Sequence, residues 1–124
     1  MRRTLGVNIK TKEPTEHQIQ CAIVDWCALQ GIAIFAIPNG GYRHITTARK
    51  LQREGVKAGV PDLFVPIVRG KCGGLFIEVK TKIGKLSDLQ RFWLGELVEN
   101  GYRCEIVRSL EDGIKVLKGY VYEN

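Results

Sequence analysis

The segment that decides the fold is GVPDLFVPIVRGKCGGLFIEVKTK, residues 59–82. It contains two apolar runs, LFVPIV (63–68) and LFIEV (75–79), and the glycine-rich RGKCGG between them is typical of a turn. Short apolar runs bounded by turn residues predict buried strands. The segment therefore predicts two neighbouring strands, joined as a hairpin, in the core of a small domain.

Charged residues stand at the ends of these strands: Asp62 before the first, and Glu78 and Lys80 at the end of the second. Alternate residues of a strand share a face, so Glu78 and Lys80 are neighbours on one face. A strictly regular hairpin closed by RGKCGG would set Val65 opposite Glu78 and turn Asp62 to the other face. A one-residue bulge, which Pro66 favours, would return Asp62 to the face of Glu78.

Two acids and a lysine at one end of a strand pair fit a site for phosphodiester hydrolysis. Asp62 and Glu78 could supply carboxylates to Mg²⁺, and the backbone carbonyl of Val79 could add a third oxygen. Lys80 could orient the attacking water or stabilise the transition state. The alternative is a structural ion pair of Lys80 with Glu78 or Asp62, although such a pair is expensive beside apolar strands.

Length and charge define the class of protein. The 124 residues suit one domain, and we divide them into an N-terminal arm (1–13) and a single domain (14–124). The formal net charge of +6 favours a polyanionic partner, and the plainer alternative is a soluble protein that happens to be basic. The sequence has no basic amphipathic helix with a bulky apolar face, which disfavours a membrane surface. No apolar run is long enough to span a bilayer, and residues 1–14 lack the apolar core of a signal peptide. We therefore expect a cytoplasmic protein without a membrane partner.

The four cysteines have no CxxC spacing, which disfavours a zinc site and indicates reduced thiols.

Capping residues and periodicity predict the other elements. A first helix occupies 14–31, with Thr15 as its N-cap and Gln18 as the capping-box partner. Its apolar stripe comprises Ile19, Ala22, Ile23, Trp26 and Leu29. A strand at 32–37 stops at the turn PNGG, and a polar helix follows at 46–55.

Towards the C-terminus, the sequence predicts a helix at 87–101, a strand at 102–107 and a last helix at 109–119. Ser87 caps the first of these helices with Gln90 as its partner, and Gly113 is expected to interrupt the last. Helices mixed with a few apolar strands predict an α/β domain whose mixed sheet is covered on both faces.

Several blocks of the sequence resemble the VRR-NUC domain, a branch of the PD-(D/E)XK nucleases. They are GVPDLFVPI, GGLFIEVKT and GKLSDLQRFWLGEL, and the upstream TEHQIQCAIVDW and IPNGG also fit. The resemblance extends from about residue 14 to about residue 118. It implies a restriction-endonuclease-like fold with an αβββαβ core, in which the helix at 46–55 is an insertion. It also implies DNA cleavage that depends on Mg²⁺ or Mn²⁺, with no small-molecule cofactor.

The resemblance also assigns roles. Asp62 and Glu78 would be metal ligands and Lys80 the catalytic lysine, while Glu16 would complete the metal site directly or through water. Gln90 would lie near the active site. Small members of this kind are often viral and resemble homodimeric nucleases that prefer branched DNA such as four-way junctions, which would place the protein in a host cytoplasm.

Some of these residues have plainer interpretations. Gln90 is already explained as a capping partner, and Glu16 suits the positive end of a helix dipole. Asn39 in PNGG is more often a turn residue than a substrate contact. Residues that could contact DNA are Asn39, Arg43, Arg49, Lys50, Arg53, Lys57, Lys82 and Lys85. A solvated helix face is the alternative for Arg49, Lys50 and Arg53.

Two other functions remain open at this point. The basic charge also fits a nucleic-acid-binding module without catalysis, although two carboxylates repel a phosphate unless a cation lies between them. A structural or assembly protein could use the same acids in internal ion pairs.

Overall fold

The computed structural model describes residues 12–38 and 45–123. Its elements are α1 (Glu16–Gln30), β2 (Phe35–Ala36), α2 (Ile45–Arg53), β3 (Leu63–Val65), β4 (Leu75–Val79), α3 (Asp88–Glu99), β5 (Arg103–Val107) and α4 (Leu110–Tyr122). This is the predicted order, with α2 inserted after the first strand. Most of the predicted N-terminal arm, together with Asn39 and Arg43, lies outside the described residues.

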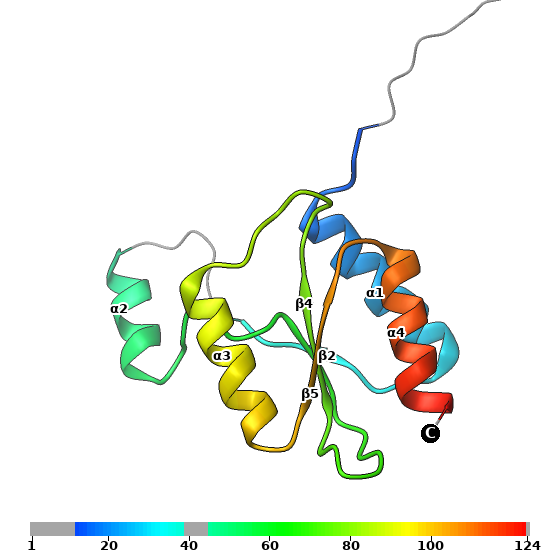
Figure 1. Ribbon diagram of the computed structural model, residues 1–124. Helices are drawn as coiled ribbons and strands as arrows, with labels where there is room; N and C mark the ends of the chain where they lie inside the picture. The colour runs from blue at the N-terminus through cyan, green and yellow to red at the C-terminus, as the bar shows by residue number, and fades with distance from the viewer. Residues whose placement is uncertain (1–11, 39–44, 124) are drawn as a thin grey trace, which may run out of the picture.

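The strands form one mixed sheet in the order β2-β3-β4-β5. β3 is antiparallel to both of its neighbours, whereas β4 and β5 are parallel. Figure 1 shows the sheet edge-on, with α3 on one face, α1 and α4 on the other, and α2 beyond α3. The predicted α/β class, with a mixed sheet flanked by helices, is therefore confirmed.

The core lies between the sheet and the pair α1 and α4. Alternate residues of the central strands are fully buried: Leu63, Val65, Leu75, Ile77 and Val79. From α1, the buried residues are Ile19, Ile23 and Cys27. The predicted stripe included Leu29, which is 84% exposed. That prediction was wrong because the buried stripe follows a spacing of four residues, which leads to Cys27 and rotates away from Leu29.

The pairing of β3 with β4 differs from the predicted register. Leu63 pairs with Ile77 and Val65 with Leu75, so Asp62, the next residue out, stands opposite Glu78. The predicted bulge and the pairing of Val65 with Glu78 were wrong, because β3 ends before Pro66 and the loop is longer than RGKCGG. A regular ladder is enough to bring the two acids to one face.

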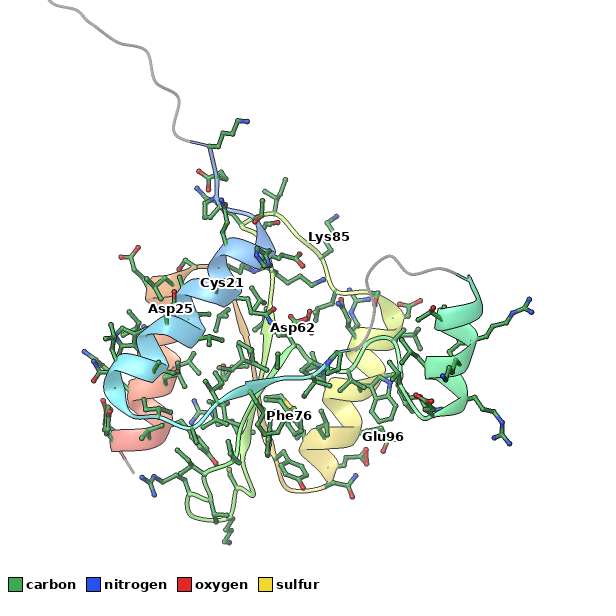
Figure 2. All side chains as sticks on the ribbon, turned by 180° about the vertical axis from the view of Figure 1, so that it is seen from behind. Cys21, Asp25, Asp62, Phe76, Lys85 and Glu96 are labelled. Atoms are coloured by element: carbon green, nitrogen blue, oxygen red, sulfur yellow. The ribbon has the colours of Figure 1, made fainter. Side chains whose placement is uncertain are left out.

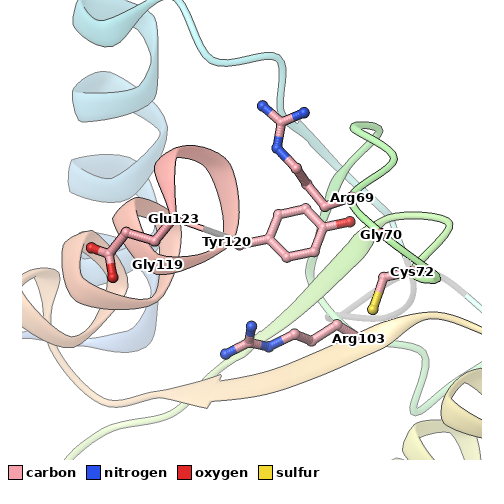
Figure 3. A pocket seen from close by; sticks show the side chains of 7 residues that line it. All are labelled: Arg69, Gly70, Cys72, Arg103, Gly119, Tyr120 and Glu123. Carbon is pink, nitrogen blue, oxygen red and sulfur yellow. The ribbon is translucent and has the colours of Figure 1, made fainter.

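The loop between β3 and β4 is fixed to the end of α4. The Arg69 guanidinium donates two hydrogen bonds to the carbonyl of Val121, at 3.1 and 2.8 Å. The Tyr120 hydroxyl donates to the carbonyl of Ile67. Figure 3 shows Arg69 and Tyr120 lining a pocket beside this loop. The loop lies at the opposite end of the β3–β4 pair from Asp62. These contacts hold the hairpin whose other end carries the acids.

Gly113 was expected to interrupt the last helix, but α4 is continuous from Leu110 to Tyr122. Gly113 is buried where α4 meets α1, and a Cβ atom there would lie 2.8 Å from Cδ1 of Ile23. The glycine is therefore required by the close approach of two helices rather than by a break in one. None of the helices within 12–38 and 45–123 is long and apolar enough to cross a membrane.

We predict that Gly113→Ala destabilises the fold by about 1–3 kcal/mol, because the new methyl group would overlap the fully buried Ile23. Chemical denaturation at low protein concentration measures the effect. Gly119→Ala is the matched control, because it lies in the same helix and its Cβ would meet no atom within 4 Å. The control should be neutral or stabilising. Equal stability of the two variants would contradict the packing argument.

Candidate active site

Three charged side chains meet at one end of the β3–β4 pair. Asp62 immediately precedes β3, Glu78 lies in β4, and Lys80 follows β4. Glu78 is 2% exposed and Lys80 is 8% exposed, although both have ionisable side chains. The Nζ atom of Lys80 lies 3.9 Å from Oε2 of Glu78. Figure 2 labels Asp62 at this end of the sheet, near the loop that carries Lys85.

Backbone hydrogen bonds fix Asp62. Its Oδ2 atom accepts a hydrogen bond of 2.8 Å from the backbone N–H of Val79. Its own carbonyl accepts a hydrogen bond from the N–H of Ile37, also at 2.8 Å, which extends the β2–β3 ladder. Since the N–H and C=O of one strand residue point to the same side, the Val79 carbonyl also lies on the Asp62 side of β4.

The two carboxyl groups disfavour each other's charge. Burial, followed by repulsion from Asp62, raises the pKa of Glu78 to about 8, although Lys80 opposes the shift. Burial also raises the pKa of Asp62, against the opposing hydrogen bond from Val79. One lysine does not compensate for the two carboxylates, of which Glu78 is buried and Asp62 is half-buried. A cation between them would favour the charged form of both.

Gln90 connects α3 to this pair. Its side-chain oxygen accepts a hydrogen bond of 2.8 Å from the N–H of Ser87, and its own N–H donates to the Ser87 hydroxyl at 3.1 Å, as predicted for a capping box. Its side-chain nitrogen donates to Oε2 of Glu78 at 3.1 Å. The two interpretations of Gln90 are therefore compatible, because different atoms of one side chain cap the helix and contact the acid.

Glu16 is the first residue of α1, after the predicted N-cap Thr15, and it is exposed. Its charge raises the pKa of both Asp62 and Glu78, so it lies near them. Within residues 12–38 and 45–123, no group of three or more His, Cys, Asp or Glu side chains is placed to hold a metal ion. Asp62 and Glu78, with the carbonyl of Val79, still fit Mg²⁺, which commonly takes one or two carboxylates and completes its shell with water and phosphate.

The predicted DNA-contacting residues fall into two groups. Lys82 and Lys85 are exposed on the loop from β4 to α3, beside the acids. The other described members are exposed on α2 or just after it: Arg49, Lys50, Arg53 and Lys57. Figure 1 places α2 apart from the sheet, beyond α3, so the fold does not bring the second group to the acids. A role in phosphate binding stays a prediction for both groups.

Arg108 is a positioning residue that the sequence analysis missed. Its Nη1 atom donates hydrogen bonds to the carbonyls of Thr81 at 2.8 Å and Gly84 at 2.7 Å, and approaches that of Lys82 at 3.4 Å. A Cβ on Gly84 would lie 3.4 Å from Cδ of Lys80, so the held segment packs on the stem of Lys80. An arginine after a strand gives no sequence signal for this role, which depends on the parallel pairing of β5 with β4.

Comparisons with known proteins agree with this fold. The sequence profile of the VRR-NUC domain matches residues 6–111. A solved structure described as a VRR_NUC domain protein is 28% identical, with a TM-score of 0.78, and the match covers 91% of this chain and 93% of that one. Another, a VRR_NUC domain, is 22% identical with a TM-score of 0.59, covers 86% of this chain and 99% of that one, and supports the fold alone. No curated protein sequence matches the chain.

We predict that Glu78→Gln raises the melting temperature in EDTA, and by more at pH 8 than at pH 5. The pKa of Glu78 rises from its ordinary value of 4.5 to about 8 on folding. The free energy of unfolding therefore falls as the pH increases from 4.5 towards 8, because the folded state holds this proton more tightly than the unfolded state. The glutamine does not titrate and can keep a polar contact with Gln90. Differential scanning fluorimetry across this pH range measures the effect. A gain that is constant with pH would show that the Glu78 charge is not destabilising.

A second prediction concerns Arg108. Arg108→Met should speed amide hydrogen exchange in residues 81–84 and lower the stability of the fold by about 1–2 kcal/mol, because the loop carbonyls lose their shared donor. Arg91→Met is the control, since the side chain of Arg91 forms an exposed ion pair with Asp88 away from this loop. If the amides of residues 81–84 exchanged at the parent rate in both variants, Arg108 would not be a positioning residue.

Proposed function

The chain belongs to the VRR-NUC domain family, and from this premise we propose that it is a metal-dependent endonuclease that cleaves branched DNA as a homodimer. Family membership implies a nuclease-type domain that acts on nucleic acid. The observation that carries the finer proposal is the placement of Asp62 directly across from Glu78, with Lys80 beside them. A non-catalytic binding module would have no use for two adjacent acids that repel phosphate.

The proposed cofactor is Mg²⁺, with Mn²⁺ as a substitute. Asp62 and Glu78 would hold it with the carbonyl of Val79, and Glu16, whose charge acts on both acids, would contribute through a water molecule. When bound, such an ion supplies Lewis acidity and neutralises negative charge on the phosphate. Its binding would also relieve the repulsion that raises the pKa of Glu78.

The protein's own groups preorganise this site. Val79 fixes the Asp62 carboxylate with its N–H, and Gln90 fixes that of Glu78 with its side-chain amide. The ammonium group of Lys80 is held beside Glu78, where it can orient the attacking water and stabilise charge that develops on the phosphate. Because hydrogen bonds hold the two carboxylates and an ion pair holds Lys80 before substrate arrives, little reorganisation is needed during reaction.

The exposed cations suit binding to the DNA backbone. Lys82 and Lys85 beside the acids could contact phosphates next to the scissile bond, while Arg49, Lys50 and Arg53 on α2 could contact a more distant part of the duplex. Such contacts depend on salt and carry no sequence information, so any selectivity would come from DNA shape. A four-way junction needs two cuts, and a twofold dimer supplies two related active sites.

The test is cleavage of an end-labelled four-way junction, a linear duplex and a single strand, with Mg²⁺, Mn²⁺ or EDTA. We expect metal-dependent cuts confined to the junction. Glu78→Gln and Lys80→Ala should each reduce the rate at least about 100-fold, as loss of a group that acts on the transition state does. The exposed controls Glu96→Gln and Lys118→Ala change the same residue types away from the acids and should keep parent activity.

Cleavage of all three substrates would support the nuclease activity but contradict the proposed selectivity for branched DNA. Failure of the parent to cut any substrate, with either metal, would overturn the proposal.

A further inference from the structure

We propose that β5 is the surface through which two copies of the chain pair, with its open edge joining β5 of the partner in antiparallel orientation. This inference rests on the homodimer of the proposed function and names the surface that forms it. It would join the sheets of the two copies into one continuous sheet. Three features support this proposal: the unpaired backbone groups of β5, the grooves on either side of the strand, and its charge pattern.

The first support is the unused backbone edge of β5. β5 is one edge strand of the sheet and has five residues, whereas β2, the other edge strand, has two. The N–H of Arg103 donates to Gly74, and the carbonyl of Val107 accepts from Lys80, so the odd-numbered groups face β4. The N–H and C=O groups of Cys104 and Ile106 therefore face outward, without partners in the described parts of the chain. Such an edge is a template for another strand.

The second support is the space beside that edge. Figure 1 looks onto β5, with α3 on one side and α4 on the other. An apolar groove lies on the α3 side, lined by Leu94, Gly95, Val98, Glu99, Cys104, Glu105 and Ile106. α3 has no fully buried residue, and Val98 is 56% exposed. A more polar groove on the α4 side includes Arg103, Glu105 and Lys115. The β5 strand of a second copy could enter between these two grooves, and Val98 could then pack against the partner's α3.

The third support is the charge pattern, which selects one register. In a twofold antiparallel pair, outward-facing residues must stand opposite outward-facing residues, so the symmetric registers that pair at least three residues of β5 are centred on residue 104, 105 or 106. The register centred on 105 opposes two copies of Glu105, and the one centred on 106 sets Glu105 opposite the partner's Val107, without an opposite charge. The register centred on 104 places Arg103 opposite the partner's Glu105. Like charges directly opposite destabilise a sheet and unlike charges stabilise it.

The same side chains already interact within one chain. The Nε atom of Arg103 lies 2.8 Å from Oε2 of Glu105. In the register centred on Cys104, two such pairs would form a closed ring of four alternating charges on the α4 side of the sheet. On the α3 side, Cys104 would stand opposite the partner's Cys104. The outward N–H of Cys104 would donate to the carbonyl of the partner's Cys104.

This pairing has a consequence for catalysis. The twofold axis would run perpendicular to the sheet, so the acid pairs of both copies would lie on the same face. Glu78 is level with Ile106, two residues from the axis along β5. From the rise along a strand and the spacing between strands, the Cα atoms of the two Glu78 residues would be roughly 20 Å apart. Two sites related by the axis on one face could act on two strands of the same junction.

Charge reversal tests the register. Arg103→Glu would face the partner's Glu105, and Glu105→Arg would face the partner's Arg103, so each should weaken dimerisation at least about tenfold in sedimentation equilibrium. The double variant Arg103→Glu/Glu105→Arg restores opposite charges and should recover most of the parent affinity. Arg53→Glu, which makes the same change on α2, is the control and should dimerise like the parent. An ion pair that acted only within one chain would change the melting temperature but not the concentration dependence of mass.

Amide hydrogen exchange tests the backbone pairing directly. The amides of Cys104 and Ile106 should become protected as the protein concentration rises through the dimerisation range. A dimer in which these amides stay unprotected, or whose dissociation constant is unchanged in both single charge-reversal variants, would overturn the β5 surface and leave the proposed function intact. A monomer at all concentrations, with and without junction DNA, would overturn both the surface and the homodimer. The cleavage assay decides the nuclease activity separately.

Discussion

The structure depends on the register between β3 and β4. β3 has only three residues, and its ends are fixed by Leu63 opposite Ile77 and Val65 opposite Leu75. All four side chains are fully buried in the same core. A shift of one residue would turn them out of the core, so the apolar contacts select a single pairing. That pairing sets Asp62 opposite Glu78, and the position of every other group in the site follows from it.

The core thus imposes an unfavourable arrangement of charge at its own edge. Burial and mutual repulsion raise the pKa of both carboxyl groups, and the lysine beside them compensates only in part. A protein that used these residues for stability alone would be better served by apolar side chains of similar size. The arrangement makes physical sense if a cation and a phosphate complete it, because the repulsion then becomes affinity for the ion.

The sequence was sufficient for the order of elements, both capping boxes and the grouping of Asp62, Glu78 and Lys80 at one end of the strand pair. Apolar runs and caps are local signals, and Thr15, Ser87 and Gln90 behave as their spacing predicts. The failures concern contacts between segments. Pro66 was assigned to a strand that ends one residue earlier, which shifted the predicted register. The packing of α4 on α1 explains Gly113, and the parallel pairing of β5 with β4 explains Arg108.

These long-range contacts also separate a rigid part of the molecule from an outlying one. The segment after β4 is held at both ends: Arg108 binds its first carbonyls, and Gln90 joins the start of α3 to Glu78. The groups that would meet the scissile phosphate are therefore held in place before substrate binds. α2 stands apart from the sheet, and its cations contact solvent. Catalytic geometry tolerates little displacement, whereas phosphate contacts are tolerant of position, so this division of tasks suits the proposed nuclease.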